Sequence, residues 1–256
     1  MRRMLPIIAA VALLLTVPSE LPRANAPAEA VEWFERGNML YQNRDFAGAR
    51  EAYEKVVQMG IESPEVYYNL GNTHARLGDN GRAVLWYERA RRLAPRDPDL
   101  LANLRRVTPV SGEDSPGILT LPFVTVLETF SLREWMLAFL TVFWVVGILG
   151  FLLMSRGAWS SHAWLRRAFW TSGTLVLIVG MFASAKYRDS LMVARVVLVT
   201  DLAAVRSGPG EKFNELARFR AGTKLRRMAY DDGAWMEVVL PDGRKGFVPK
   251  QAAEHL

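Results

Sequence analysis

The chain has 256 residues, of which half are hydrophobic, and it carries a formal net charge of +6 but no cysteine. The lack of cysteine excludes thiol catalysis, disulfide bonds and thiolate metal sites. The length predicts one or two domains. Three apolar runs, which lie outside the repeated segment described below, predict membrane segments.

The first apolar run has the layout of a secretory signal. Arg2 and Arg3 precede the run LPIIAAVALLLTV, and small residues follow it at Ala24, Ala26, Ala28 and Ala30. This pattern predicts a signal peptide over residues 1–28, cleaved after Ala28. An uncleaved anchor is the alternative, because the stretch after the apolar core is long for a signal peptide. Both alternatives export the residues that follow.

The next segment contains the same pattern twice. Residues 31–64 align without a gap on residues 65–98, a period of 34 residues. A period in this range marks helical units that stack, because neither unit buries its apolar face alone. Identical residues stand at matching positions, namely Gly37 and Gly71, Asn38 and Asn72, Asp45 and Asp79, Ala49 and Ala83, Tyr53 and Tyr87, and Glu54 and Glu88.

Each copy predicts two helices joined by a turn. In the first copy, apolar and small residues recur three or four positions apart in two stripes, at Trp33, Gly37, Leu40 and Tyr41 and then at Phe46, Ala49, Tyr53 and Val56. Arg44-Asp45 supplies the turn of the first copy, and Gly78-Asp79-Asn80-Gly81 supplies that of the second. Residues 99–107 form a further half unit that covers the end of the stack.

The period and its signature positions resemble the tetratricopeptide (TPR) repeat. We assign residues 29–107 to two such repeats and a capping helix, with Arg36 and Ile61 at positions where the family usually has leucine and proline. The resemblance implies a groove for partner proteins, lined by Phe34, Asn38, Tyr41, Tyr68, Asn72 and Arg76. In the family, the amides at the position of Asn38 and Asn72 bind a peptide backbone. The alternative is that these amides satisfy local backbone groups.

The second and third apolar runs each predict a transmembrane helix. Residues 135–154 carry no charge and are long enough to span a hydrocarbon core of about 30 Å. Residues 168–185 reach about the minimum length for spanning, and a buried core helix is the alternative for them. Allowing for the flanking residues, we place the spans at residues 132–155 and 168–187.

The loop between the spans predicts their orientation. Residues 156–167 contain Arg156, Arg166 and Arg167 and no acidic residue, which is typical of a cytoplasmic loop. With an exported amino terminus, both outer ends of this hairpin would then lie on the periplasmic side of a bacterial inner membrane. Residues 108–131, before the first span, are predicted to be a linker or an interfacial segment.

Residues 190–256 change from a helical to an alternating pattern. They predict strands at residues 193–199, 224–230, 235–240 and 245–249. Asp232-Gly233 and Asp242-Gly243 stand between alternating runs, where such pairs indicate hairpin turns. Several short strands in a segment of this length predict a small all-β barrel.

The terminal segment also resembles the bacterial SH3 domain (SH3b). The resemblance rests on residues 204–210, Phe213, residues 221–224, 233–235, 240–244 and 246–248, with Phe247 where tryptophan is commoner. It implies binding of peptides or cell-wall material, with Arg206, Tyr230, Trp235 and Phe247 as the candidate surface. The alternative is that the aromatic residues complete the barrel, while Met236, Val238 and Leu240 form its inward face.

Together these segments predict a multidomain membrane protein with all-α TPR helical hairpins, two transmembrane helices and a small all-β SH3-like barrel. This order resembles the E-type family of the Bat (Bacteroides aerotolerance) group, whose members occur with von Willebrand factor A membrane proteins and MoxR-type ATPases. The resemblance implies a role in envelope stress or in the assembly of a membrane complex. We therefore predict a non-enzymatic scaffold for membrane and envelope proteins. A sensor or targeting subunit that binds peptidoglycan through the SH3b domain is the alternative.

The sequence offers no pattern for an enzyme, a metal or a cofactor. His74, His162 and His255 lie in three separate segments, so no pair is predicted to share a metal or a nucleophile. The glycines at residues 208–210 do not follow the strand-to-helix pattern that cradles phosphate. Export argues against nucleic acid as a partner.

Positive charge gathers on the last helices of the repeats, at Arg89, Arg91, Arg92, Arg96, Arg105 and Arg106. These residues fit an anionic lipid surface or an acidic partner. Ordinary solvated helix faces are the alternative, because Glu88, Asp97 and Asp99 interrupt the run.

Overall fold

The computed structural model describes residues 27–109, 121–155, 163–192 and 194–256. Nearly all of the predicted signal peptide, most of the loop 156–167 and the middle of the linker 108–131 lie outside these residues. The described chain divides into two compact units. Residues 133–184 belong to one unit, and residues 28–132 together with 185–256 form the other.

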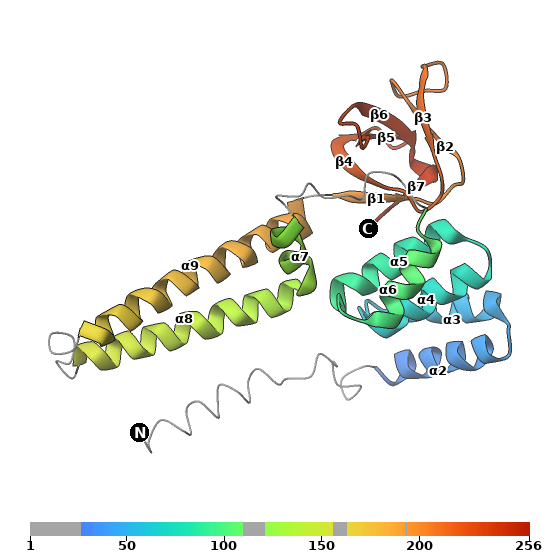
Figure 1. Cartoon of the computed structure of the whole chain (residues 1–256). Coiled ribbons are helices and arrows are strands. Elements are labelled where there is room, and N and C mark those ends of the chain that lie inside the picture. The colour runs from blue at the N-terminus through green and yellow to red at the C-terminus, as the bar shows by residue number, and fades with distance from the viewer. Residues whose placement is uncertain (1–26, 110–120, 156–162, 193) are drawn as a thin grey trace. The chain divides into compact units, whose positions relative to one another are not determined.

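The repeat segment folds into consecutive helices that pack as two antiparallel pairs and a final helix, as the sequence predicts (Figure 1). Aspartate or serine caps the start of α3, α4, α5 and α6 by accepting a hydrogen bond from a backbone N–H of the first turn. The helices are α2 (Ala28–Gln42), α3 (Phe46–Gln58), α4 (Pro64–Arg76), α5 (Asn80–Leu93) and α6 (Pro98–Val107).

Glycine and tyrosine pair inside each repeat. The rings of Tyr53 and Tyr87 are buried, and each lies directly against the helix that carries Gly37 or Gly71. A Cβ atom would lie 2.5 Å from the ring of Tyr53 at residue 37 and 2.4 Å from the ring of Tyr87 at residue 71. Only glycine therefore lets the two helices of each pair approach this closely.

The turns of the two repeats agree with the prediction except at Asn80 and Gly81, the first two residues of α5. Arg44 and Gly78 occupy the left-handed region, with φ of 63° and 79°, and Asp45 and Asp79 cap the following helices. Gly81, which the sequence assigns to the turn, lies inside α5 instead. Its small size serves a contact with the terminal sheet, described below.

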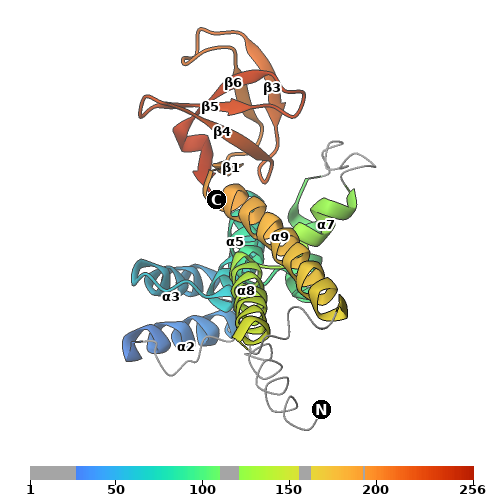
Figure 2. The same ribbon diagram turned by 90° about the vertical axis from the view of Figure 1, so that its left-hand side faces the viewer.

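A short helix, α7 (Leu121–Thr129), precedes the two long apolar helices, α8 (Leu132–Ser155) and α9 (Ala163–Met192). Helices α8 and α9 run side by side in opposite directions (Figures 1 and 2). Trp135 stacks on Phe182 at 4.9 Å, and Gly150 makes room for the ring of Phe169.

Both long helices contain a segment that is long and apolar enough to cross a membrane, Leu132–Phe151 and Arg167–Arg188. Only 11% and 0% of their most apolar windows are buried, which disfavours the alternative of a buried core helix. Helix α9 extends past the predicted span at both ends and includes residues 163–167 of the predicted loop. A helix continues wherever its backbone can pair, whereas a span ends where the apolar side chains end.

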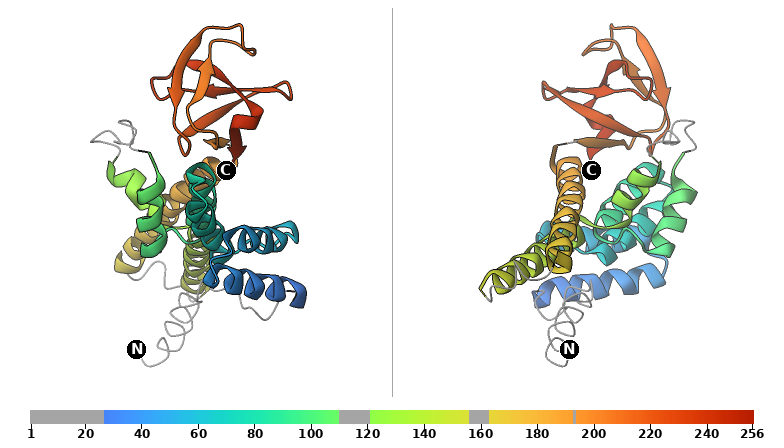
Figure 3. Two further views of the ribbon diagram at one scale, coloured as in Figure 1. Left: turned by 90° about the vertical axis from the view of Figure 1, so that its right-hand side faces the viewer. Right: turned by 60° about the vertical axis from the view of Figure 1, so that its left-hand side comes forward.

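The terminal segment forms a seven-stranded antiparallel sheet in the order β3-β2-β6-β5-β4-β1-β7. The sheet is strongly curved (Figures 2 and 3). The strands β3 and β7 remain as edges, so the sheet is not closed and the predicted SH3-like barrel is not confirmed. The strands are β1 (Arg195–Leu198), β2 (Ala203–Arg206), β3 (Glu215–Phe219), β4 (Lys224–Asp231), β5 (Trp235–Val239), β6 (Lys245–Pro249) and β7 (Ala253–His255), with a 3-10 turn at Lys250–Ala252.

The two predicted hairpins are present in this sheet. Gly233 and Gly243 take φ of 86° and 83° in the turns between β4 and β5 and between β5 and β6. Met236, Val238 and Leu240 are buried, as expected for the inward face. The strands β2, β3 and β7 were not predicted from the sequence; they are short, and β3 has no fully buried residue.

Candidate functional site

The same polar contact recurs in both repeats. The hydroxyl of Tyr53 donates a hydrogen bond to Asn38 Oδ1 at 2.9 Å, and the hydroxyl of Tyr87 donates one to Asn72 Oδ1 at 2.7 Å. Burial raises the pKa of Tyr53 to about 12 and also raises the pKa of Tyr87. Both phenols therefore stay protonated at neutral pH and act as donors.

Two further asparagines add hydrogen bonds between helices, one between the first helices of the two repeats and one between the second repeat and the capping helix. Asn69 on α4 donates to Asn38 Oδ1 at 3.2 Å, and Asn103 on α6 donates to Asn72 Oδ1 at 3.0 Å. We call these four residues, on α2, α4 and α6, the asparagine row. Asn69 and Asn103 were missed in the sequence, although they are separated by the same 34 residues as Asn38 and Asn72.

These contacts fix which end of each amide is free. The Oδ1 atoms of Asn38 and Asn72 each accept two hydrogen bonds from side chains. Neither amide bonds a local backbone group in the described part of the chain, contrary to the alternative drawn from the sequence. The Nδ2 of Asn72 makes no hydrogen bond within that part and is not buried, and the Nδ2 of Asn38 reaches Glu35 only at 3.4 Å. The row thus leaves amide N–H donors available.

The other predicted groove residues surround the row. The rings of Phe34 and Tyr68 pack at 5.9 Å against Tyr53 and Tyr87, respectively. Tyr68 also accepts a hydrogen bond from Asn103 at 3.0 Å, which joins it to the row.

Tyr41 and Arg76 meet at the ring of Phe46. Tyr41 packs on this ring at 5.2 Å, and the Arg76 guanidinium lies over it at 5.9 Å. Burial raises the pKa of Tyr87, and the positive charges of Arg76 and Arg106 partly offset this rise. Both charges therefore act on the tyrosine that is hydrogen-bonded to the asparagine row. The face combines amide donors, half-buried aromatic rings and cations.

Replacing Tyr87 with phenylalanine tests the tyrosine contact. We expect Y87F to lower the free energy of unfolding by about 1 kcal/mol, because Asn72 Oδ1 loses one of its two donors. Urea unfolding of the full chain in detergent, followed by circular dichroism, measures this change. Y187F is the matched control, because Tyr187 is 49% exposed, and it is expected to change stability by less than about 0.5 kcal/mol. Equal stability of the two variants would contradict the role given to the hydroxyl.

On the sheet, three of the four predicted surface residues come together. Arg206 on β2 pairs with Phe247 on β6, and the ring of Tyr230 meets Phe247 edge-on at 5.4 Å. Directly paired residues project from the same face of a sheet, so these side chains share the face opposite the buried Met236.

Trp235 lies apart from this group along β5, where it pairs with Pro249, and its ring contacts no other ring in the described residues. Tyr230 is the most exposed aromatic residue of the predicted surface, at 41%. The Arg206 guanidinium is held by the backbone oxygen of Phe213 at 3.0 Å.

The sheet also packs against the repeats, through α5. Val197 belongs to the hydrophobic core of the repeats, and the partly buried Leu256 packs against it. A Cβ atom on Gly81 would lie 2.7 Å from Val199 Cα, so glycine allows the strand backbone to reach the helix. The equivalent residue of the first repeat is Ala47, which is exposed.

Arginines of α5 hold the last residues of the chain at this contact. Arg82 Nε donates to Glu254 at 2.8 Å, and Arg89 Nη2 donates to the backbone oxygen of His255 at 2.7 Å. Arg82 also pairs with Asp79 at 3.0 Å. Burial alone would raise the pKa of Asp79, but the His74 ring, whose Nδ1 lies 3.4 Å from Asp79 Oδ2, and the hydrogen bonds from Arg82 lower it to about 2.

A buried carboxylate completes this contact. Glu88 is 2% exposed, and it binds Arg91 at 2.9 Å and Lys224 of β4 at 3.0 Å. Burial alone would raise the pKa of Glu88, but the charges of Arg91 and Lys224 outweigh it and hold the pKa below its ordinary value. The repeat alignment identifies Glu88 as a shared position but gives no sign that its partner lies in the sheet.

Comparison with known families agrees with the geometry of the repeats. The model of the tetratricopeptide repeat family matches residues 34–98. This range contains both glycine–tyrosine pairs and all of the asparagine row except Asn103. Comparison with curated proteins gives no match. Residues 34–98 are therefore tetratricopeptide repeats, followed in the chain by two long apolar helices and an antiparallel sheet.

Proposed function

We propose that the protein is a non-enzymatic scaffold that holds partner proteins at a membrane. Tetratricopeptide repeats generally mediate protein–protein interaction, and the asparagine row is the observation that carries the proposal. The carbonyl oxygens of Asn38 and Asn72 are occupied by tyrosines and by neighbouring asparagines, so the N–H groups of these two amides are the ends that can reach a ligand.

The chemistry of this face favours an extended segment of a partner protein. An extended peptide presents backbone carbonyl oxygens, which accept hydrogen bonds from the amides of Asn38 and Asn72. The half-buried rings of Tyr41 and Tyr68 offer apolar contact beside these amides. Arg76 adds a positive charge, which favours a segment with acidic side chains.

The helices α8 and α9 are proposed to anchor this scaffold as a membrane hairpin. Large side chains such as Phe151 and Leu177 are 70% and 74% exposed on these helices. Exposed apolar surface of this extent is costly in water and favourable in a hydrocarbon core.

The contact between the repeats and the sheet supports the hairpin topology. The repeats precede α8 in the chain and the sheet follows α9, yet Gly81 and Val199 are in contact. Two segments that pack on each other lie on the same side of a membrane, so the chain between them crosses it an even number of times. The arginines of the loop 156–167 favour the cytoplasm for that loop, which leaves the repeats and the sheet in the periplasm.

The resemblance to the Bat E-type family suggests what is recruited. We propose partners among envelope and membrane proteins, including von Willebrand factor A membrane proteins, in a complex that serves envelope stress. The SH3b resemblance adds the face of Arg206, Tyr230 and Phe247 as a second docking surface.

Cross-linking in intact membranes tests this function. We expect wild-type chain to capture a reproducible set of membrane proteins, and N72D to capture about tenfold less of them. Aspartate keeps the oxygen that Tyr87 and Asn103 require, but it removes the N–H donor and repels a peptide carbonyl.

The matched control is N43D, because Asn43 is exposed in the turn after α2 and lies outside the asparagine row. It should leave the captured set unchanged. Equal capture by N72D and wild type would refute the role of the row. Recovery of peptidoglycan fragments in place of proteins would favour the wall-binding sensor.

A further inference from the structure

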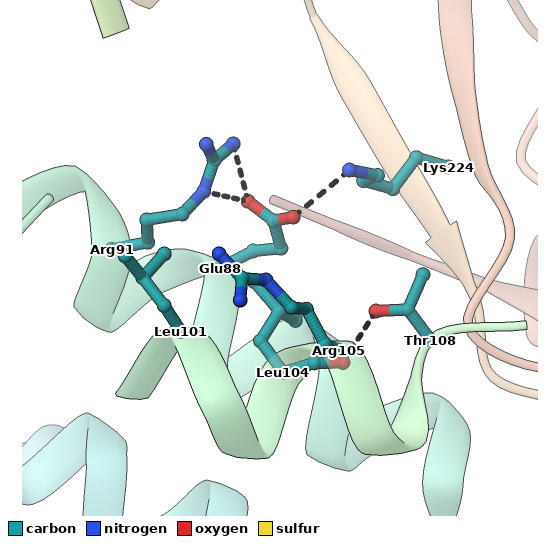
Figure 4. A pocket seen from close by; sticks show the side chains of 7 residues that line it. All are labelled: Glu88, Arg91, Leu101, Leu104, Arg105, Thr108 and Lys224. Atoms are coloured by element: carbon teal, nitrogen blue, oxygen red, sulfur yellow. Dashed lines mark hydrogen bonds and ion pairs between the residues drawn. The ribbon is translucent and has the colours of Figure 1, made fainter. Parts of the chain in front are cut away.

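A pocket lies between the last repeat helices and the sheet (Figure 4). Its volume is about 190 Å³, and a single water needs only about 10–15 Å³, so it admits a group of several heavy atoms such as a phosphate. The residues that line it come from α5, α6, the residue after α6 and β4, and they are Glu88, Arg91, Leu101, Leu104, Arg105, Thr108 and Lys224.

The lining carries more positive than negative charge. Arg91 and Lys224 each bind one oxygen of Glu88, at 2.9 Å and 3.0 Å, so this carboxylate is already satisfied. Glu128 lies 3.7 Å from a second nitrogen of Arg91. The third cation of the lining, Arg105, is exposed and makes no hydrogen bond or ion pair within the described chain. The pocket therefore presents one uncompensated guanidinium, and Lys224 retains further N–H donors.

The rest of the lining is apolar or already bonded. Leu101 and Leu104 form one wall of the pocket, and Figure 4 shows Arg105 beside them. The Thr108 hydroxyl donates to the backbone oxygen of Leu104 at 2.7 Å. An occupant with an anionic group and an adjoining apolar part suits both kinds of wall.

Two contacts hold arginines of α5 and of the residues after it against the segment that precedes the first apolar helix. Arg91 reaches Glu128 of α7, and the Arg96 guanidinium lies 5.0 Å from the centre of the Phe130 ring. The apolar helix α8 begins at Leu132, only two residues after Phe130. If α8 enters a bilayer, these arginines lie at the depth of the lipid headgroups.

From these observations we propose that the pocket binds the phosphate of an anionic phospholipid headgroup. The guanidinium of Arg105 and the ammonium of Lys224 contact the phosphate, and the leucine wall contacts the glycerol and the first acyl carbons. The inference rests on the membrane anchor of the proposed function. A free phosphate offers the same anionic chemistry, but the leucine wall and the nearness of Leu132 favour the lipid.

Native mass spectrometry of the full chain in neutral detergent tests the proposal with phosphatidylglycerol, phosphatidylcholine and inorganic phosphate as separate probes. We expect phosphatidylglycerol to bind more tightly than phosphatidylcholine, and R105A to weaken phosphatidylglycerol about fivefold. R106A removes the same charge from the neighbouring residue of α6, which does not line the pocket, and should change binding less than about twofold. Arg105 is exposed, so R105A keeps the fold, which circular dichroism verifies.

Equal weakening by R105A and R106A, or equal binding of the two lipids, would overturn the pocket as a lipid site. Binding of inorganic phosphate that depends on Arg105, without binding of phosphatidylglycerol, would overturn the lipid as the source of the anion. Release of the wild-type chain from membranes by alkaline carbonate would instead overturn the anchor and with it the proposed function. A chain that stays in the membrane but binds lipid equally with and without Arg105 refutes this inference alone.

Discussion

A methyl group at residue 81 is expected to force the terminal sheet away from α5. The Cβ of alanine would lie 2.7 Å from Val199 Cα and 2.8 Å from Val199 O. Backbone atoms cannot rotate aside as a side chain does, so relief requires the strand to move. We expect G81A to cost about 1–3 kcal/mol in the stability of this contact.

Hydrogen exchange of the full chain in detergent measures this effect. Amides of residues 195–199 should exchange faster in G81A, because they lie against the helix in the wild type. G147A is the control, since a Cβ at that residue of α8 meets no atom within 4 Å. Unchanged protection of residues 195–199 in G81A would show that the contact tolerates a methyl group.

Removal of the Lys224 charge is the second large effect that we expect. K224M leaves Glu88 buried with Arg91 as its remaining cation. Loss of one partner of a buried ion pair is strongly destabilising, and the partial compensation by Arg91 sets the expected cost at about 1–3 kcal/mol at pH 7. K245M is the matched control, because Lys245 is exposed and pairs with Glu237 at the surface, and its cost should stay below about 1 kcal/mol.

The pH dependence of K224M gives an independent readout. In the wild type the pKa of Glu88 lies below its ordinary value of 4.5, so its charge stabilises the fold above that pH. This contribution is lost as the pH falls through the lowered pKa. Without Lys224 the pKa of Glu88 rises, so the gap between its folded and unfolded values narrows and urea unfolding should show a smaller loss of stability on acidification than in the wild type. The same acid profile in K224M and the wild type would refute the importance of the pair.

Much of the local structure could be predicted from the sequence, because its causes are local. The 34-residue period puts glycine at residues 37 and 71 and tyrosine at residues 53 and 87, and in the structure each glycine lies against the tyrosine of its own repeat. The pairs Asp232-Gly233 and Asp242-Gly243 lie at the hairpin turns because glycine tolerates a positive φ there.

The strands β2, β3 and β7 escaped prediction for a physical reason. They contain three to five residues each, and the burial of β3 does not alternate. A strand this short is stabilised by its neighbours in the sheet and has little pattern of its own. The open edges at β3 and β7 likewise depend on pairing, which is why a closed barrel was expected and an open sheet is observed.

The candidate site, too, could be predicted only in part from the sequence. Asn38 and Asn72 were found through the repeat, but their tyrosine and asparagine partners become visible only when the helices pack.

By itself, the sequence determined the repeats, the two apolar helices and the tight hairpin turns, since each depends on residues close together in the chain. Only the tertiary structure decided that the repeats and the sheet are in contact. Glu54 and Glu88 occupy equivalent repeat positions, yet only Glu88 is buried against Lys224, 136 residues away. Gly81 likewise looks like a turn residue until Val199 is seen against it. Contacts between residues so far apart arise from packing and desolvation, which no local pattern encodes.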